Sequence, residues 1–251
     1  MGFVKLGGNL ETGANAVNIA ASPYMLENVV RPMPPMDVDY ETPESDGMVY
    51  VGAARRCPVI SMRVWVTGTS EQRREKTRTL ARLLSQTTAT RLEFEDDGGK
   101  YYHVVCTGDR TPEDYIDSTC FDLTFQSIYP YMFGEKRTYT LSNTSQNIST
   151  LGTYPARLQL SGSIATSATG NVSVYIGSNT LTYKLGDSAA TYDIDIDWDT
   201  RDSSTGSTSR APAIGGTWAK IYSTTGSEYR TTARVSTSGS SPTLTVTDRW
   251  I

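Results

Sequence analysis

Hydrophobic and polar residues alternate regularly in one stretch of the N-terminal half. The apolar positions are Ile60, Met62, Val64 and Val66, and the positions between them are Ser61, Arg63, Trp65 and Thr67. A period of two places successive side chains on opposite faces of a strand. The pattern therefore predicts a strand with one buried face over residues 60–67.

A longer period follows directly and predicts the one helix that the pattern supports. Its apolar stripe consists of Thr77, Leu80, Ala81 and Leu84, with Leu83 beside it. Ser70 stands where an N-cap is expected, and Glu71 in the first turn favours the positive end of the helix dipole. We therefore expect a helix that begins at Ser70 and ends near Leu84.

A hairpin is predicted after the helix, from strands around residues 92–95 and 101–106. Residues 96–99, Asp-Asp-Gly-Gly, tolerate the positive φ that a tight turn needs. A last strand around residues 121–126 alternates Phe, Leu and Phe with polar residues. In the order strand, helix, hairpin, strand, one helix covers an antiparallel sheet.

Beyond about residue 140 the chain consists of short alternating segments separated by Gly, Ser and Asp, without helical periodicity. Strands are predicted at residues 156–160, 172–176, 180–184, 192–198, 218–222, 229–235 and 244–250. This spacing indicates a β-sandwich. The polar stretch 139–153 predicts a linker or loop, so we divide the chain into domains of residues 1–138 and 139–251.

The predicted fold class is therefore mostly β. An α+β N-terminal domain, made of an antiparallel β-sheet or sandwich with one α-helix, precedes a C-terminal β-sandwich.

Residues 14–50 show little periodicity and are rich in proline. The prolines are Pro23, Pro32, Pro34, Pro35 and Pro43. Each proline removes a backbone donor and fixes φ, so this stretch cannot form a central strand. We expect an extended arm with edge-strand pieces, which is useful when a neighbouring subunit covers its other side.

Charge and cysteine content narrow the class of protein. The formal net charge of −4 argues against nonspecific nucleic-acid binding as the main role. We expect no secretory signal in residues 1–10 and no membrane span, because the required apolar runs are missing. Cys57, Cys106 and Cys120 are odd in number and lack metal-site spacing, which favours buried reduced thiols and folding in a cytoplasm.

Candidate catalytic residues are few. His103, the only histidine, has no nucleophile motif around it, so we expect no catalytic role. Glu93 and Glu95 superficially resemble a glycosidase carboxylate pair, but neighbours on one hairpin face should point to solvent instead of flanking a sugar. No phosphate-binding or dinucleotide motif is present. We predict no catalytic, cofactor-binding or metal site, and hence a protein that is not an enzyme.

One predicted strand is unusually acidic. Its alternation places on one face Asp193, Asp195, Asp197 and Asp199. A hard cation such as calcium would relieve their repulsion. As an EF-hand loop the segment fails, because Trp198 stands where the glycine must be. A solvated face, or an edge protected from pairing by its charge, is the preferred explanation.

Two further groups of side chains leave alternatives open. The aromatic residues of the second half, which either stack on sugars or pack in the sandwich core, are Trp198, Trp218, Trp250, Tyr175, Tyr183 and Tyr222. The basic residues of the helix, which either meet an acidic partner or pair with Glu71 and Glu75 on a solvated face, are Arg73, Arg74, Lys76, Arg78 and Arg82.

The order and the amino-acid sequences of several segments resemble the distal tail protein (Dit) family of siphophages. The segments are Asp46-Gly47, Pro58-Val59-Ile60, Leu80-Ala81-Arg82-Leu83-Leu84, Leu92-Glu93-Phe94-Glu95-Asp96, Lys100-Tyr101-Tyr102, Phe121-Asp122-Leu123-Thr124-Phe125 and Tyr129-Pro130-Tyr131-Met132-Phe133-Gly134. They cover roughly residues 1–138. In the second half, Ile194-Asp195-Ile196-Asp197 and Asp248-Arg249-Trp250-Ile251 resemble the C-terminal galectin-like β-sandwich of shorter family members.

The resemblance implies a structural role in the virion, at the phage tail tip, for a protein made in the bacterial host cytoplasm. Its N-terminal domains would form a homo-hexameric hub ring between the tail tube protein and the tail-associated hub protein. Its C-terminal domains would project outward and hold peripheral receptor-binding proteins. The family has no catalytic residues. The alternatives are a glycan-binding β-sandwich module for host-surface adhesion and a hydrolase of cell-wall polysaccharide.

Overall fold

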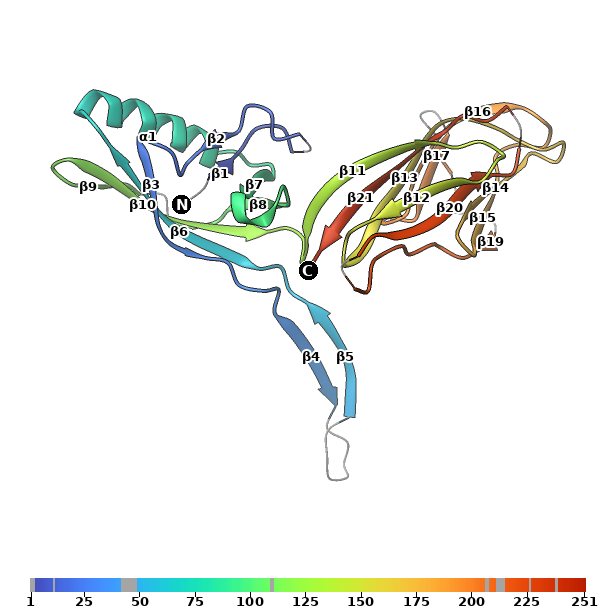
Figure 1. Ribbon diagram of the computed structural model, residues 1–251, viewed down its shortest axis with the longest axis horizontal. Helices are drawn as coiled ribbons and strands as arrows, with labels where there is room; N and C mark the ends of the chain where they lie inside the picture. Colours follow the sequence, from blue (N-terminus) through green and yellow to red (C-terminus); the bar gives the residue numbers. More distant parts are fainter. Residues whose placement is uncertain are drawn as a thin grey trace. The chain divides into compact units, whose positions relative to one another are not determined.

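The structure is a computed structural model that describes residues 3–10, 12–41, 49–108, 111–205, 208–210, 215–225, 227–237 and 239–251. Its described part is mostly β, with a single α-helix and antiparallel sheets, as the sequence predicts. The chain forms two compact units, Met1–Phe133 with Ile251, and Gly134–Trp250 (Figure 1). The division between the units falls between Phe133 and Gly134, a few residues before the predicted domain boundary at residues 138/139.

The first unit is built on an antiparallel sheet. Its strands are β1 (Val4–Leu6), β2 (Val17–Asn18), β3 (Tyr24–Val30), β6 (Val59–Thr67), β7 (Thr90–Phe94), β8 (Tyr101–Cys106), β9 (Glu113–Asp114) and β10 (Ser118–Ser127). The central order is β8–β10–β6–β3, with β3 at the edge. The strands β7, β1 and β2 continue outward from β8, and β9 pairs with β10. The next strand, β11 (Met132–Thr140), begins beside β8, with Phe133 opposite Tyr101.

The predicted strand of alternating residues is confirmed as β6. All four of its predicted apolar positions are buried, and β10 pairs with it antiparallel along its length. On β10, Phe121, Leu123 and Phe125 enter the same core. The period of two therefore identified both central strands, because each has one face on the core.

The helix α1 (Ser70–Leu84) covers this core with Leu80 and Leu84. Its N-cap is Thr69, so the prediction of Ser70 is wrong by one residue. Gln72 N donates to Thr69 Oγ1 at 3.4 Å, and Thr69 N donates to Gln72 Oε1 at 3.1 Å. This reciprocal capping box needs a Gln or Glu three residues after the cap, a condition that Thr69 meets and Ser70, followed by Arg73, does not.

The predicted hairpin is confirmed as β7 and β8, which pair antiparallel. Its turn contains a short 3₁₀ helix, η1 (Glu95–Asp97), closed by Gly98 at φ +60°. A glycine stands there because that left-handed conformation strains other residues.

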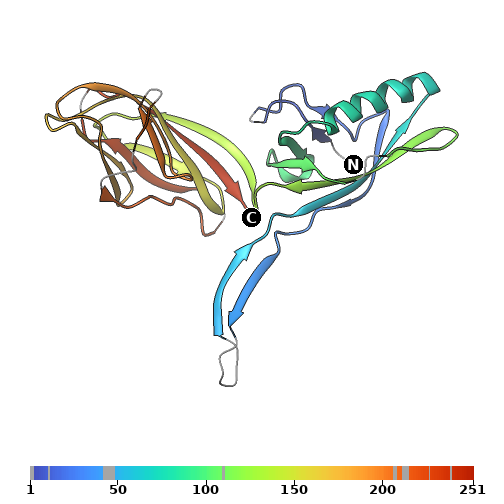
Figure 2. The ribbon, with the colours of Figure 1, turned by 180° about the vertical axis from the view of Figure 1, so that it is seen from behind.

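The predicted proline-rich arm is present in the structure and contains more regular strands than the sequence indicates. Its β3 segment is an edge strand, as expected. Beyond it, β4 (Met36–Glu41) and β5 (Val49–Arg55) form a two-stranded antiparallel sheet of their own. We call these two strands the arm hairpin. In two opposite views it projects away from the sheet of its unit (Figure 1, Figure 2).

The second unit is a β-sandwich. Its strands after β11 are β12 (Gln146–Thr150), β13 (Tyr154–Ala165), β14 (Asn171–Ile176), β15 (Asn179–Lys184), β16 (Thr191–Asp197), β17 (Asp202–Thr205), β18 (Thr208–Arg210), β19 (Gly215–Gly216), β20 (Tyr229–Val235) and β21 (Thr243–Trp250). One sheet has the order β18–β17–β16–β13–β21–β11, and the other β12–β20–β14–β15–β19. Apolar residues of both sheets share one core.

Two predictions for this unit are wrong. Residues 139–153 are not a linker, because they contain the end of β11 and all of β12, and Leu141 and Ile148 are core residues. Isolated apolar residues in a Ser/Thr/Asn-rich run give too weak a pattern to reveal a short strand. Residues 218–222 form no strand, although Ala219 and Ile221 are buried and Ala156 N donates to Ile221 O at 2.9 Å. The alternation of apolar and polar residues in 218–222 therefore reflects which side chains are buried, and not a strand.

Candidate interaction surfaces

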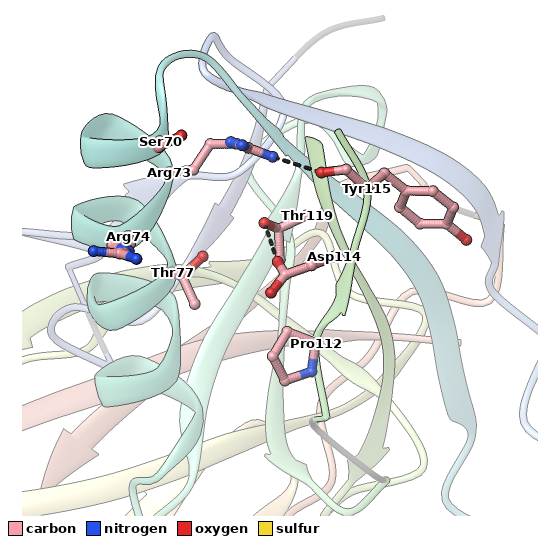
Figure 3. A pocket seen from close by; sticks show the side chains of 8 residues that line it. All are labelled: Ser70, Arg73, Arg74, Thr77, Pro112, Asp114, Tyr115 and Thr119. Carbon is pink, nitrogen blue, oxygen red and sulfur yellow. Dashed lines mark hydrogen bonds between the residues drawn. The ribbon is translucent and has the colours of Figure 1, made fainter. Parts of the chain in front are cut away.

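The loop that joins β9 to β10 is fixed by hydrogen bonds on several sides. Tyr115 N donates to Ser118 O at 2.8 Å and closes the turn. Thr119 Oγ1 donates to Asp114 Oδ1 at 2.7 Å, next to the helix (Figure 3). We call residues 113–118 the braced loop.

The main brace comes from the helix. Arg73 of α1 extends toward the loop, where its Nη1 donates to Tyr115 O at 2.9 Å (Figure 3). Its Nη2 donates to Ile116 O at 3.0 Å. A guanidinium offers two parallel donors in a fixed fork, so one side chain holds two consecutive carbonyls. Arg73 is therefore committed within the chain and is not a free part of a basic helix face.

The loop nevertheless presents apolar surface. Ile116 is 91% exposed, and Tyr115 is more than half exposed. The Tyr115 ring lies 5.4 Å from the Trp65 ring, and its hydroxyl donates to Glu113 Oε2 at 3.1 Å, which raises the pKa of Tyr115. Ile116 and Tyr115 are adjacent, so the loop presents two neighbouring exposed apolar side chains in a fixed conformation.

A second apolar surface lies where the arm hairpin leaves the sheet. It is an open hollow of about 650 Å³ lined by Pro32, Met33, Pro35, Arg55, Arg56, Cys57, Val59 and Gln126. We call it the arm-base pocket. Met33 is 89% exposed at its rim. Gln126 Nε2 donates to Cys57 O at 3.0 Å and Arg56 N donates to Pro35 O at 2.8 Å, so the walls are tied together.

The arm hairpin itself is a third surface. Its exposed apolar side chains are Met36, Val38, Tyr50 and Val51. A two-stranded hairpin is marginally stable by itself in water, and this one belongs to a separate two-stranded sheet. It therefore has the composition and geometry of an element that another molecule covers.

The sequence pattern predicts the arm but not the braced loop. The available signal was the pair Tyr115-Ile116 inside the polar run 111–118. Two adjacent apolar residues in a loop are common, and only the structure shows that they are exposed and fixed.

His103 lies in an aromatic cluster. Its ring stacks on Phe133 at 4.3 Å and lies 5.5 Å from Tyr101 and 5.9 Å from Tyr129. These contacts are those of packing between β8 and the start of β11. That His103 is not catalytic stays a prediction.

Glu93 and Glu95 do not share a solvent-facing side, so that expectation is wrong. Glu93 is only 7% exposed, and its carboxylate accepts from Arg91 Nη2 at 2.8 Å. The Arg91 guanidinium lies 3.5 Å from the centre of the Tyr101 ring. Glu93 lies on β7 between β1 and β8, and its partner Arg91 also donates to Leu10 O at 3.4 Å, whereas Glu95 is exposed at the beginning of the turn.

The acidic residues of β16 are separated by their partners. Asp193 and Asp195 are exposed, whereas Asp197 accepts from Arg157 Nη2 at 2.8 Å and Asp199 Oδ1 from Arg249 Nη1 at 3.1 Å. Among the described residues, no group of three or more His, Cys, Asp or Glu could hold a metal ion. The protected-edge explanation is wrong, because β16 pairs with β13 on one side and β17 on the other.

Burial raises the pKa of Asp197, but the hydrogen bond from Arg157 and those from the Asp199 backbone and Gln159 outweigh it. Its net pKa lies below the ordinary value. Groups of the same β-sandwich thus stabilise the charged form of the Asp197 carboxylate.

The aromatic residues proposed for glycan stacking mostly pack inward. Trp198 is 7% exposed and meets Trp218 edge to face at 5.7 Å, and Tyr183 is buried in the same core. Tyr175 lies under the Arg234 guanidinium at 3.8 Å. Only Tyr222 of the six is more than one-third exposed among the described side chains. The rings therefore form no exposed stacking platform.

The remaining basic residues of α1 do not form the expected pairs. Arg74, Arg78 and Arg82 are exposed, and no ion pair among the described residues joins them to Glu71 or Glu75. Lys76 lies 3.8 Å from Glu75. None of the three cysteines forms a disulfide: Cys106 and Cys120 are buried, and Cys57 is half-buried in the arm-base pocket. No helix in the described part of the chain is long and apolar enough to cross a membrane.

No protein-family model and no curated protein sequence matches the chain. The fold, in contrast, matches solved structures of a phage hub adsorption protein and of a phage baseplate. The crystal structure of the SPP1 Dit (gp19.1) protein, described as a paradigm of the hub adsorption apparatus in phages that infect Gram-positive bacteria, matches with a TM-score of 0.70 and 15% identity. The match covers 99% of this chain and 99% of the SPP1 chain.

A chain of the phage P2 baseplate in its activated conformation with Ca matches with a TM-score of 0.50 and 10% identity, over 98% of this chain and 97% of that one. At such identities the likeness is one of fold. The resemblance to the Dit family predicted from the sequence is confirmed by a fold shared over the whole chain, both units included.

Proposed function

We propose that the chain is a structural, non-catalytic component of a phage tail tip or baseplate. In this proposal six copies form a hub ring that joins the tail tube to the tail-associated hub protein and anchors peripheral receptor-binding proteins. The protein would act in the virion, after synthesis in the bacterial host cytoplasm.

The observation that carries the proposal is the match to SPP1 Dit over 99% of both chains. Because the match includes both units, it concerns a specific combination of domains and not merely one common β fold. A common fold alone would say little about function.

The arm hairpin supports the ring. It exposes apolar side chains on a sheet of two strands, which needs a covering partner to be stable. A partner of the same kind, repeated in one direction, produces a closed ring when the rotation closes. In the described part of the second unit, Trp198, Trp218 and Tyr183 pack in or against the core, so these rings give the glycan-binding alternative no support.

The mass of the purified protein in solution tests the ring. Light scattering at micromolar concentration should give about six subunits, and negative-stain microscopy should show six-fold particles. The variant Val38→Asp, on the arm hairpin, should lower the assembled fraction at least about tenfold, because a buried charge without a partner costs several kcal/mol. The matched control Tyr222→Asp, on the second unit, should assemble normally. A wild-type protein that stays monomeric up to its solubility limit, alone and with tail tube protein, contradicts the ring.

A further inference from the structure

We propose that neighbouring copies in the ring are joined by the braced loop of one copy, whose Ile116 inserts into the arm-base pocket of the next copy. This inference rests on the ring of the proposed function and names its contact residues. Four observations support it.

The two surfaces lie at opposite ends of the same pair of strands. Ser118, at the base of the braced loop, pairs with Thr67, and Gln126, in the pocket, pairs with Val59. Ser118 and Gln126 are eight residue steps apart along β10, a length of about 26 Å. A loop at one end and a pocket at the other cannot meet within one copy, but they allow head-to-tail contact between copies.

The two surfaces are also complementary in polarity. The loop presents Ile116, the most exposed large apolar side chain among the described residues, with Tyr115 beside it. The pocket presents Met33 and Val59, both substantially exposed, and is also lined by two prolines. Removing both from water together gives the apolar centre that stable interfaces have.

Charge supports the same pairing. Beside Ile116 the loop carries exposed carboxylates on Glu113 and Asp117. The pocket is flanked by the exposed guanidinium groups of Arg55 and Arg56. Arg56 is paired with Asp37 of the arm hairpin, whereas Arg55 has no ion-pair partner among the described residues. An acidic loop and a basic pocket rim attract each other and orient the encounter.

Hydrogen bonds within one copy already hold both surfaces in an ordered conformation before they meet. Arg73 fixes the loop carbonyls, and Gln126 ties the pocket wall to Cys57. Ordered surfaces lose little conformational freedom on binding, so more of the contact energy appears as affinity. The occupant we infer is a second copy of this chain, because each copy carries one loop and one pocket and leaves both uncovered.

Two single variants test the contact. Ile116→Asp removes the apolar tip of the loop, and Met33→Asp places a charge at the pocket rim. Both positions are almost fully exposed in the single chain, so both variants should fold, with melting temperatures close to that of wild type. By mass photometry each variant alone should be monomeric where wild type is assembled.

An equimolar mixture of the two variants gives the decisive result. The intact loop of Met33→Asp can enter the intact pocket of Ile116→Asp, and the remaining loop and pocket are both blocked. The mixture should therefore form heterodimers and stop at two subunits. The control Tyr229→Asp, an exposed aromatic of the second unit, should assemble like wild type.

The other outcomes separate this inference from the ring. If both variants assemble like wild type, the loop–pocket contact is wrong and the ring stands. If both are monomeric but their mixture gives no dimer, the loop and the pocket do not meet each other, and the inference is overturned. If wild type itself never assembles, both the proposed ring and this contact are wrong.

Discussion

Arg73 on the helix holds the main chain of Tyr115, 42 residues further along the chain, with its Nη1 2.9 Å from the Tyr115 carbonyl oxygen. The second arm of the same guanidinium holds Ile116 in the same way. This contact fixes an exposed apolar loop to the rigid body of the first unit, and the position of the loop therefore depends on the helix.

Replacing Arg73 by Ala should loosen the braced loop. Both carbonyls lose a charged donor, so amide hydrogen exchange in residues 113–118 should become at least about tenfold faster, the equivalent of about 1.4 kcal/mol. Arg73→Lys should restore little, because an ammonium group cannot fork between two carbonyls in this geometry. Arg74→Ala, on an exposed neighbour, is the control. Equal exchange rates in all these proteins would show that the brace does not order the loop.

The position of the helix N-cap can be tested with two adjacent alanine variants. Thr69→Ala removes the side-chain acceptor of the capping box and should lower the free energy of unfolding of the first unit by about 1 kcal/mol. Ser70→Ala should change it by less than about 0.5 kcal/mol, because Ser70 is exposed in the first helical turn. Urea unfolding measured by circular dichroism distinguishes them. A larger loss of unfolding free energy in Ser70→Ala than in Thr69→Ala would show that Ser70 is the N-cap.

Asp248 organises the junction between β12 and β21 within the second unit. It is 1% exposed, accepts from Thr150 Oγ1 at 2.7 Å and from Leu151 N at 3.2 Å, and lies 3.2 Å from Arg137. Asp248→Asn should lower the free energy of unfolding of this unit by about 2–3 kcal/mol, because it leaves Arg137 without its buried counter-charge. Asp193→Asn, at an exposed carboxylate, should have an effect near zero.

The effect of Asp248→Asn is measured as the shift in the midpoint of urea unfolding of the second unit, monitored by tryptophan fluorescence. A change equal to that of Asp193→Asn would mean that water replaces the lost interactions of Asp248 without cost.

The stability of the second unit should depend on pH through Asp197. Burial raises its folded-state pKa, but the hydrogen bonds from Arg157, the Asp199 backbone and Gln159, with the positive charge of Arg157, together hold that pKa below the ordinary value. A depressed carboxyl pKa stabilises the folded state fully above the unfolded value of about 3.9, and this stabilisation is lost as pH falls through the lower folded value.

Arg157→Gln tests this dependence. The difference in melting temperature between wild type and variant should be largest above about pH 5 and should shrink as the pH falls below about 4. Lys220→Gln removes an exposed cation from the same unit and should give a constant difference. A wild-type–Arg157→Gln difference that does not change with pH would show that the pair does not set the pKa of Asp197.

Several elements were predictable from local pattern. The alternation in residues 60–67 gave β6 and its buried face, and the helical stripe gave α1 and both of its buried leucines. The prolines of residues 14–50 correctly excluded a central strand and indicated an arm. These predictions succeeded because period and proline content act through local backbone geometry.

Other features depended on partners that are distant in the sequence. Glu93 is buried in contact with Arg91, which reaches Leu10 near the start of the chain, and β12 is a strand because β20 pairs with it. The Asp-rich strand lies inside a sheet because β17 covers its free side, which no charge pattern indicated.

The sequence by itself thus determined which segments are strands or helix where one face is apolar, and that the chain resembles Dit proteins. The tertiary structure decided which polar residues are buried and which apolar residues remain exposed. Ile116 shows the difference: its exposure depends on Arg73 and on the turn that holds it, and neither contact leaves a periodic signal. Local geometry repeats along the chain and can be read from it, whereas burial is set by pairing over long separations.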